Sequence, residues 1–88
     1  MEVAKMLVLS TAHVTVTTAQ ELDASEAGAI SFPKGKYGWF VYCGDLPDRD
    51  DTPAELERAI RFAHNHDFQW IMFDCDGDTI ADLPTFEW

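Results

Sequence analysis

The sequence predicts one α+β domain spanning residues 1–88, a two-layer α/β sandwich in which two helices cover one face of a small four-stranded sheet. Short runs of apolar, β-branched and aromatic residues alternate with two segments that have helical features, and turn residues separate them. A length of 88 residues suits a single domain. The expected order of elements is β-α-β-α-β-β.

The first half contains two strands and one helix. Residues 6–9 are a short apolar run typical of a buried strand. Threonines followed by helix-forming residues predict a short helix over about 16–26, with Gly28 as its stop signal. Residues 31–36 are rich in turn formers and are expected to be a connector. The aromatic and β-branched residues 37–43 predict the second strand.

The second half is expected to begin with an acidic loop and a helix. Residues 44–51 form the loop, and Thr52 to Glu55 matches a capping box with proline at the first helical position. Apolar residues then recur three and four positions apart, which predicts one buried helix face. These residues are Leu56, Ala59, Ile60 and Ala63.

The remaining residues predict a hairpin and a docked tail. Residues 68–73 are the third strand, and the Asp-Gly pair at 76–77 is a signal for a tight turn. Residues 79–81 are the expected return strand. Aromatic residues near the end of the chain indicate that the tail, residues 83–88, packs on the body.

The net charge of −10 restricts the partners of this domain. A chain of this charge is repelled by nucleic acid and by anionic lipid, and its six cations are too few for a large basic patch. We therefore expect no direct contact with nucleic acid. No apolar run approaches the ~18–20 residues of a membrane span, and the first residues do not resemble a signal peptide, so we expect no membrane and a cytoplasmic location.

Nearly all of the excess charge belongs to the second half of the chain. Residues 1–44 hold four acids and three cations, whereas residues 45–88 hold twelve acids and three cations, which gives −1 and −9. The predicted helix neutralises part of its own charge through pairs such as Glu57 with Arg61. Eight of the remaining acids form two clusters, which are the candidate partner-binding residues. They are Asp45, Asp48, Asp50 and Asp51 in one loop, and Asp74, Asp76, Asp78 and Asp82 around the hairpin.

Residues 71–79 resemble the first motif of haloacid-dehalogenase-like phosphatases, in which an apolar strand ends in Asp-x-Asp-Gly. That resemblance implies a phosphoryl-accepting Asp74 and a general-acid Asp76 beside Mg²⁺. The later motifs of that family do not fit into the ten residues that follow Asp78. We therefore expect no catalytic residue.

The same turn matches only part of a calcium-binding loop. Asp74, Asp76 and Asp78 occupy the first three ligand positions, but Gly77 is misplaced and position twelve is Thr85 instead of glutamate. Weak divalent binding stays open, beside a β-turn whose aspartates cap their own backbone. We predict no dedicated metal site and no cofactor.

The two cysteines, Cys43 and Cys75, lie in apolar runs and lack a zinc-like spacing. Two cysteines allow one disulfide between them. In the expected compartment, reduced and buried thiols are favoured.

Several segments resemble an uncharacterised family of small acidic proteins carried by bacterial plasmids, prophages and integrative elements. The matching stretches are residues 9–13, 37–42, 60–63, 70–77 and the ending Leu83-Pro84-Thr85-Phe86-Glu87-Trp88. The resemblance implies a genetic context near antirestriction and other counter-defence genes. It implies no catalytic residue.

These observations favour a non-enzymatic inhibitor that presents a DNA-like negative surface to a basic nucleic-acid-binding protein, either a CRISPR effector or a restriction enzyme subunit. If the second and third strands are parallel neighbours, the two aspartate clusters merge into one acidic edge. The alternatives are a generic protein-interaction or toxin–antitoxin accessory module and, less favoured, a metal-binding or phosphatase-like enzyme. The oligomeric state is expected to be a monomer or a homodimer.

Overall fold

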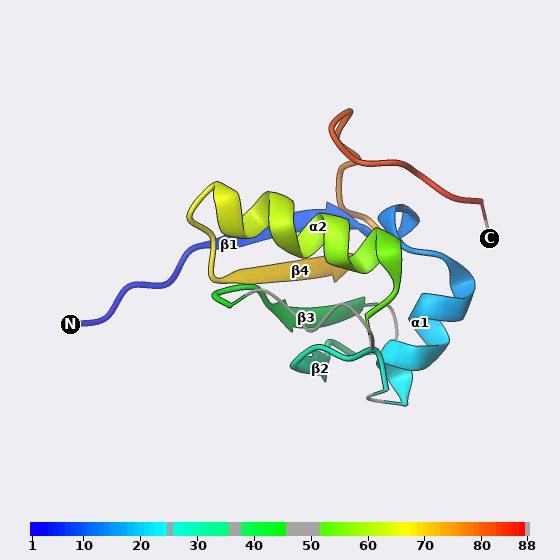
Figure 1. Ribbon diagram of the computed structural model, residues 1–88, viewed down its shortest axis with the longest axis horizontal. Coiled ribbons are helices and arrows are strands. Elements are labelled where there is room, and N and C mark those ends of the chain that lie inside the picture. Colours follow the sequence, from blue (N-terminus) through cyan, green and yellow to red (C-terminus); the bar gives the residue numbers. More distant parts are fainter. Residues whose placement is uncertain (25, 36–37, 46–51, 88) are drawn as a thin grey trace.

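The structure is a computed structural model, and it describes residues 1–24, 26–35, 38–45 and 52–87. These residues form a four-stranded sheet and two α-helices, which confirms the predicted two-layer α+β class (Figure 1). The strands are β1 (Met6–Ser10), β2 (Ser31–Pro33), β3 (Gly38–Tyr42) and β4 (Trp70–Asp74). The helices are the 3-10 turn η1 (Thr11–His13), α1 (Val16–Asp23) and α2 (Ala54–Asn65).

The order of the elements is β-α-β-β-α-β and differs from the predicted order at two places. The predicted connector contains β2, in which Phe32 pairs with Phe40 of β3. The predicted return strand at residues 79–81 is not a strand, because the Ile80 N–H donates to the ring of His13. The fourth strand therefore comes from the first half of the chain.

The strand directions decide where the loops lie. The sheet order is β1-β4-β3-β2, with β1 parallel to β4 and the other neighbours antiparallel. Leu9 pairs with Phe73, and Phe73 pairs with Trp39. The carboxyl ends of β1 and β4 consequently meet at one end of the sheet, and β3 ends at the other.

Both helices pack on the same face of the sheet. The inward side chains of the strands, including Leu9, Val41, Ile71 and Phe73, form one core with residues of α1 and α2. In Figure 1, α2 lies across this face and α1 lies beside the end of the sheet. The predicted buried face of α2 is confirmed, since Leu56, Ala59, Ile60 and Ala63 are fully buried. Among the described helices, none has the length and apolar character needed to cross a membrane.

The start of α1 follows the predicted hydroxyl cap. The Thr15 side chain accepts the Thr18 N–H at 3.2 Å and satisfies one unpaired donor of the first turn. The helix ends at Asp23, earlier than predicted, and the Asp23 carboxylate accepts the Trp39 indole N–H at 2.8 Å. This contact fixes the end of α1 to the buried face of β3.

The predicted capping box of α2 is wrong. The Thr52 hydroxyl donates to the Gly28 carbonyl oxygen at 3.1 Å, and no side-chain hydrogen bond caps the helix at Pro53. The Glu55 carboxylate instead accepts from the Thr18 hydroxyl and, at 3.0 Å, from the Thr15 hydroxyl. Glu55 therefore places its charge at the amino end of α1, where the helix dipole favours an anion.

Two opposing effects act on the pKa of Glu55. Partial burial acts to raise it, but the hydrogen bonds from Thr18, from the Glu55 backbone and from Thr15 outweigh burial and hold the pKa below its ordinary value of 4.5. A carboxyl whose pKa is lowered on folding stabilises the fold above its ordinary pKa. That contribution is lost as the pH falls through the folded-state pKa.

We expect the E55Q variant to lose about 1 kcal/mol of unfolding free energy at pH 7, because the charge that strengthens these hydrogen bonds is removed. The difference from the wild-type protein should shrink as the pH falls below 4.5, and urea unfolding at several pH values measures it. The matched control is E57Q, which removes the surface ion pair with Arg61 (2.8 Å) and should cost less than about 0.5 kcal/mol. A loss in E55Q that does not change with pH would contradict this role of Glu55.

Candidate functional site

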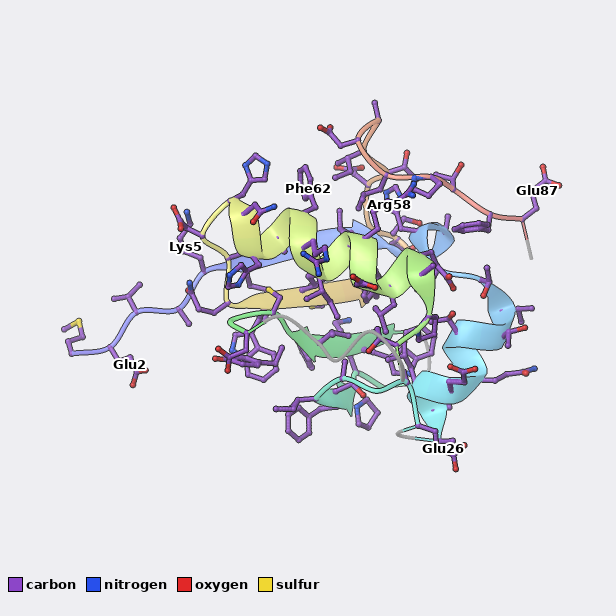
Figure 2. All side chains as sticks on the ribbon, in the orientation of Figure 1. Glu2, Lys5, Glu26, Arg58, Phe62 and Glu87 are labelled. Atoms are coloured by element: carbon purple, nitrogen blue, oxygen red, sulfur yellow. The ribbon has the colours of Figure 1, made fainter. Side chains whose placement is uncertain are left out.

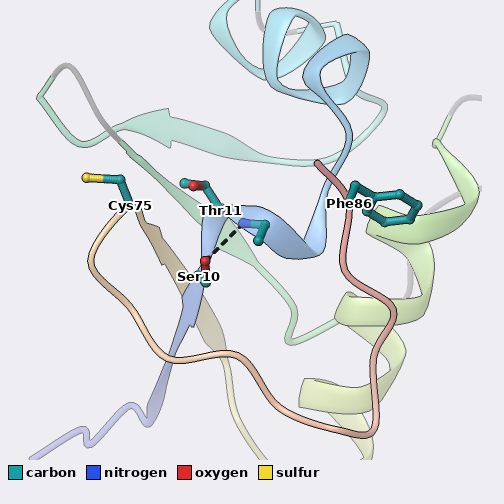
Figure 3. Close-up of a pocket in the computed structure, with 5 residues that line it drawn as sticks. Ser10, Thr11, Cys75 and Phe86 are labelled. Atoms are coloured by element: carbon teal, nitrogen blue, oxygen red, sulfur yellow. Dashed lines mark hydrogen bonds between the residues drawn. The ribbon is translucent and has the colours of Figure 1, made fainter. Parts of the chain in front are cut away.

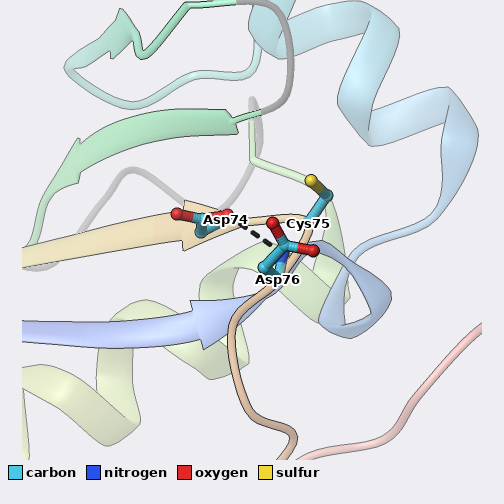
Figure 4. Close-up of side chains that lie close together, drawn as sticks. All are labelled: Asp74, Cys75 and Asp76. Carbon is cyan, nitrogen blue, oxygen red and sulfur yellow. Dashed lines mark hydrogen bonds between the residues drawn. The ribbon is translucent and has the colours of Figure 1, made fainter.

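The turn that follows β4 is built around Asp74. The Asp74 carboxylate accepts the Asp76 N–H at 2.9 Å (Figure 4). The Asp74 carbonyl oxygen accepts the Gly77 N–H at 2.9 Å. This is the β-turn with an aspartate capping its own backbone that the sequence predicts. After the turn the chain does not return as a strand but passes against the carboxyl end of β1, where the Asp78 carbonyl oxygen accepts the Ser10 N–H.

Asp74, Cys75 and Asp76 bring their ligand atoms within 4.8 Å of one another. The second oxygen of Asp74 accepts from the Lys34 ammonium at 3.1 Å. The hydrogen bond from the Asp76 N–H and then that from Lys34 hold the pKa of Asp74 below its ordinary value. Each oxygen of Asp74 thus accepts one hydrogen bond within the protein, and these contacts stabilise the turn.

The segment after this turn carries charge of one sign. Residues 75–87, which we call the acidic strap, contain no lysine, arginine or histidine. Their carboxylates, Asp76, Asp78, Asp82 and Glu87, belong to exposed residues. Glu87 points into solvent at the far end of the strap (Figure 2). The strap therefore contributes only negatively charged side chains to the surface.

Hydrogen bonds hold both ends of the acidic strap on the body. The Ser10 N–H donates to the Asp78 carbonyl oxygen at 2.9 Å, and the Phe86 N–H donates to the Ala12 carbonyl oxygen at 2.8 Å. Leu83 between them is 6% exposed and belongs to the core. These contacts confirm that the tail docks on the body, although Trp88 lies outside the described residues.

His13 fixes the middle of the strap. Its ring is 1% exposed, and its Nε2 accepts the Ile80 N–H at 3.0 Å. Because Nε2 is the acceptor, the ring proton belongs to Nδ1, which donates to the Pro84 carbonyl oxygen at 2.9 Å. A single side chain thus satisfies two backbone groups of the strap, a role that no sequence pattern indicates.

A hollow of about 340 Å³ lies beside the carboxyl ends of β1 and β4 (Figure 3). Its lining consists of Ser10, Thr11, Ala12, Cys75 and Phe86. The Ser10 hydroxyl already accepts the Ala12 N–H at 3.0 Å. The Cys75 sulfur of this lining lies within 4.8 Å of the Asp74 and Asp76 carboxylates, and the described lining residues themselves include no imidazole and no cation.

The cysteines differ from the expectation in one respect. Cys43 is buried, its thiol donates to the Phe68 carbonyl oxygen, and burial raises the pKa of the thiol to about 11. Cys75 is exposed, because the turn carries it out of the sheet. Both are free thiols.

Asp45, the one residue of the first predicted cluster that the structure describes, does not join the second cluster at one edge of the sheet. The expected merger required β3 and β4 to be parallel, and they are antiparallel. Asp45 follows the end of β3, so it lies at the opposite end of the sheet from the turn that contains Asp74, Asp76 and Asp78. Asp48, Asp50 and Asp51 lie outside the described residues. Only Asp76, Asp78 and Asp82 of the predicted residues fall within the acidic strap.

The face of the sheet opposite the helices is a surface that sequence reasoning missed. Its side chains, which we call the open face, are Met6, Val8, Phe32, Phe40, Tyr42, Trp70 and Met72. The signal was present in the strand sequences, because β1, β3 and β4 are apolar at consecutive positions instead of alternating with polar residues.

The fold and these surfaces define a small acidic α+β domain with a docked carboxylate-bearing segment and an apolar sheet face. The chain belongs to the family of unknown function DUF5983, whose C-terminal domain matches residues 6–88. Comparisons with curated proteins and with solved structures give no match.

Proposed function

We propose that this protein is a non-enzymatic acidic inhibitor that binds a basic, nucleic-acid-binding protein. The observation that supports the proposal is the acidic strap, which carries four exposed carboxylates and no cation on a segment held at both ends. The finer proposal is a target in bacterial defence, either a CRISPR effector or a restriction enzyme subunit. It places the protein in the cytoplasm of a host that carries a mobile element.

Electrostatics favours this class of target. A DNA duplex carries one phosphate charge per ~1.7 Å of helix axis, and a protein that binds it contacts these phosphates with lysine and arginine side chains. Carboxylates of the strap compete for the same cations, and their attraction accelerates the encounter. Because hydrogen bonds to Asp78, Ile80, Pro84 and Phe86 already order the strap, less conformational entropy is lost on binding.

The test uses the immobilised wild-type protein and a lysate of a bacterium that carries restriction and CRISPR systems. We expect it to retain a nucleic-acid-binding protein that a 20-base-pair duplex displaces. A strap variant with D76N, D78N, D82N and E87Q should lose this capture at least tenfold, and retention by the wild-type protein should weaken as salt rises.

The control removes the same number of charges elsewhere. A variant with E2Q, E21Q, E26Q and D67N has the same net charge of −6 as the strap variant, because each loses four of the acids that make the total −10. It should capture the target nearly as well as the wild-type protein. If both variants lose capture equally, total charge and not the strap determines binding, which contradicts the proposal. A captured target that duplex DNA does not displace would also overturn it.

A further inference from the structure

The open face is an ordered apolar surface made by all four strands. Register places Met6, Trp70 and Tyr42 in one row across the sheet, and Val8, Met72, Phe40 and Phe32 in the next row. Trp70 contacts Tyr42 and Phe32, with ring centroids 5.3 Å and 6.1 Å apart. Met6, Phe32, Phe40 and Trp70 surround a hollow of about 270 Å³. The face thus combines aromatic anchors with a recess for an apolar side chain.

The strand sequences are typical of strands covered on both sides. Strands that are buried on both faces are near-continuous apolar runs, as β1, β3 and β4 are here. Here the helices cover one face, while Met6, Val8 and Phe32 of the other face are 43%, 45% and 53% exposed. Large contiguous apolar patches on a soluble protein mark interaction sites.

Charge indicates what covers this face. Within the four described strands Asp74 is the single charged residue, and Lys34 pairs with it at 3.1 Å. The face is therefore neutral on a protein whose net charge is −10. A basic partner finds no unpaired carboxylate in these strands, whereas the same face of a second copy is equally apolar and neutral.

We propose that a second copy of this chain covers the open face, so that two sheets stack face to face in a symmetric dimer. Stacked sheets pack about 10 Å apart, and a two-fold axis places the same residues on both sides of the contact. Side chains of one copy then enter the recess of the other. This dimer does not depend on the inhibitory function proposed above.

The size of the face sets the expected affinity. Three strands of five residues and one of three, about 4.8 Å apart, cover roughly 300 Å² of flat area on each copy. Projecting side chains enlarge the buried surface, but the contact stays at the small end of specific interfaces. We therefore expect a dissociation constant in the micromolar range.

Sedimentation equilibrium of the purified protein from about 1 to 500 µM tests the dimer without any other ligand. The mass should rise from 9.9 kDa to twice that value. Added salt should strengthen the association, because the two acidic copies repel one another and salt screens that repulsion. Salt weakens the capture of a basic target, so the two proposals fail separately.

Two matched variants locate the interface. V8K places a charge in the open face, and V16K makes the same change on α1, where Val16 is 48% exposed against 45% for Val8. V8K should weaken the dimer at least tenfold, and V16K should leave it unchanged. F32S, at an exposed position of the edge strand β2, provides a second disruption, and circular dichroism verifies that each variant is folded.

Three outcomes overturn the proposal. The first is a monomer across the whole concentration range. The second is a dimer that V8K and F32S leave intact, which would place the contact on another surface. The third is a monomer whose capture of a basic target is lost in V8K and F32S, which would assign the open face to that target.

Discussion

Replacing His13 with alanine is expected to lower the free energy of unfolding by about 3 kcal/mol, one of the largest effects of any single side chain outside the apolar core. The ring is buried and bonds the Ile80 N–H and the Pro84 carbonyl oxygen. Its removal leaves a cavity and two backbone groups without their partner. The acidic strap should then detach while the sheet and α2 persist.

Urea unfolding measures the loss of stability, and hydrogen exchange measures the detachment. The amide of Ile80 should exchange at least tenfold faster in H13A, as should that of Phe86, which is bonded to the Ala12 carbonyl oxygen. H66A is the control, because His66 is exposed and should cost less than about 1 kcal/mol. An Ile80 amide that stays protected in H13A would show that other contacts hold the strap.

The same variant connects the fold to the proposed function. If the acidic strap binds its target because it is already ordered, H13A should weaken capture although every carboxylate is still present. The strap variant removes the charge and keeps the order, whereas H13A does the reverse. Together they separate the contribution of charge from that of preorganisation.

The sequence was sufficient for the elements that carry a periodic pattern. The buried face of α2 follows from Leu56, Ala59, Ile60 and Ala63, and β3 and β4 follow from their aromatic and β-branched runs. β2 could not be predicted, because residues 31–36 are rich in turn formers and the pairing of Phe32 with Phe40 is not visible in the local sequence. The Asp-Gly pair at 76–77 predicts that residues 79–81 return as a strand. In the structure the Ile80 N–H donates to His13 instead, and a local turn signal contains no information about that distant residue.

The candidate site was harder to predict, because it depends on strand direction. The sequence shows which loops contain the aspartates. Whether Asp45 lies near Asp74 in space depends on the direction in which β3 pairs with β4, and this pairing is antiparallel. Glu55 illustrates the same limit, since the capping-box spacing is present but its carboxylate bonds Thr15 and Thr18 of α1. Long-range hydrogen bonds decide these positions, and no short motif encodes them.

The second large effect is expected in the G38A variant. Gly38 lies opposite Asp74 in the pairing of β3 with β4, and a Cβ there would lie 2.0 Å from the Phe73 carbonyl oxygen. The Cβ is fixed to the β3 backbone and the oxygen belongs to the β4 backbone, so no side-chain rotation can relieve the contact and the strands must separate. We expect a loss of at least about 3 kcal/mol, from a total of roughly 4–13 kcal/mol for 88 residues.

G35A is the matched control, since it makes the same change three residues earlier in the chain. A Cβ at Gly35 meets nothing within 4 Å, but its φ of +59° is unfavourable for alanine and should cost about 1 kcal/mol. Urea unfolding followed by circular dichroism compares the two variants. If G38A is as stable as G35A, β3 and β4 do not pair in this register. Phe40 and Tyr42 would then not lie opposite Met72 and Trp70, and the open face would lose its basis.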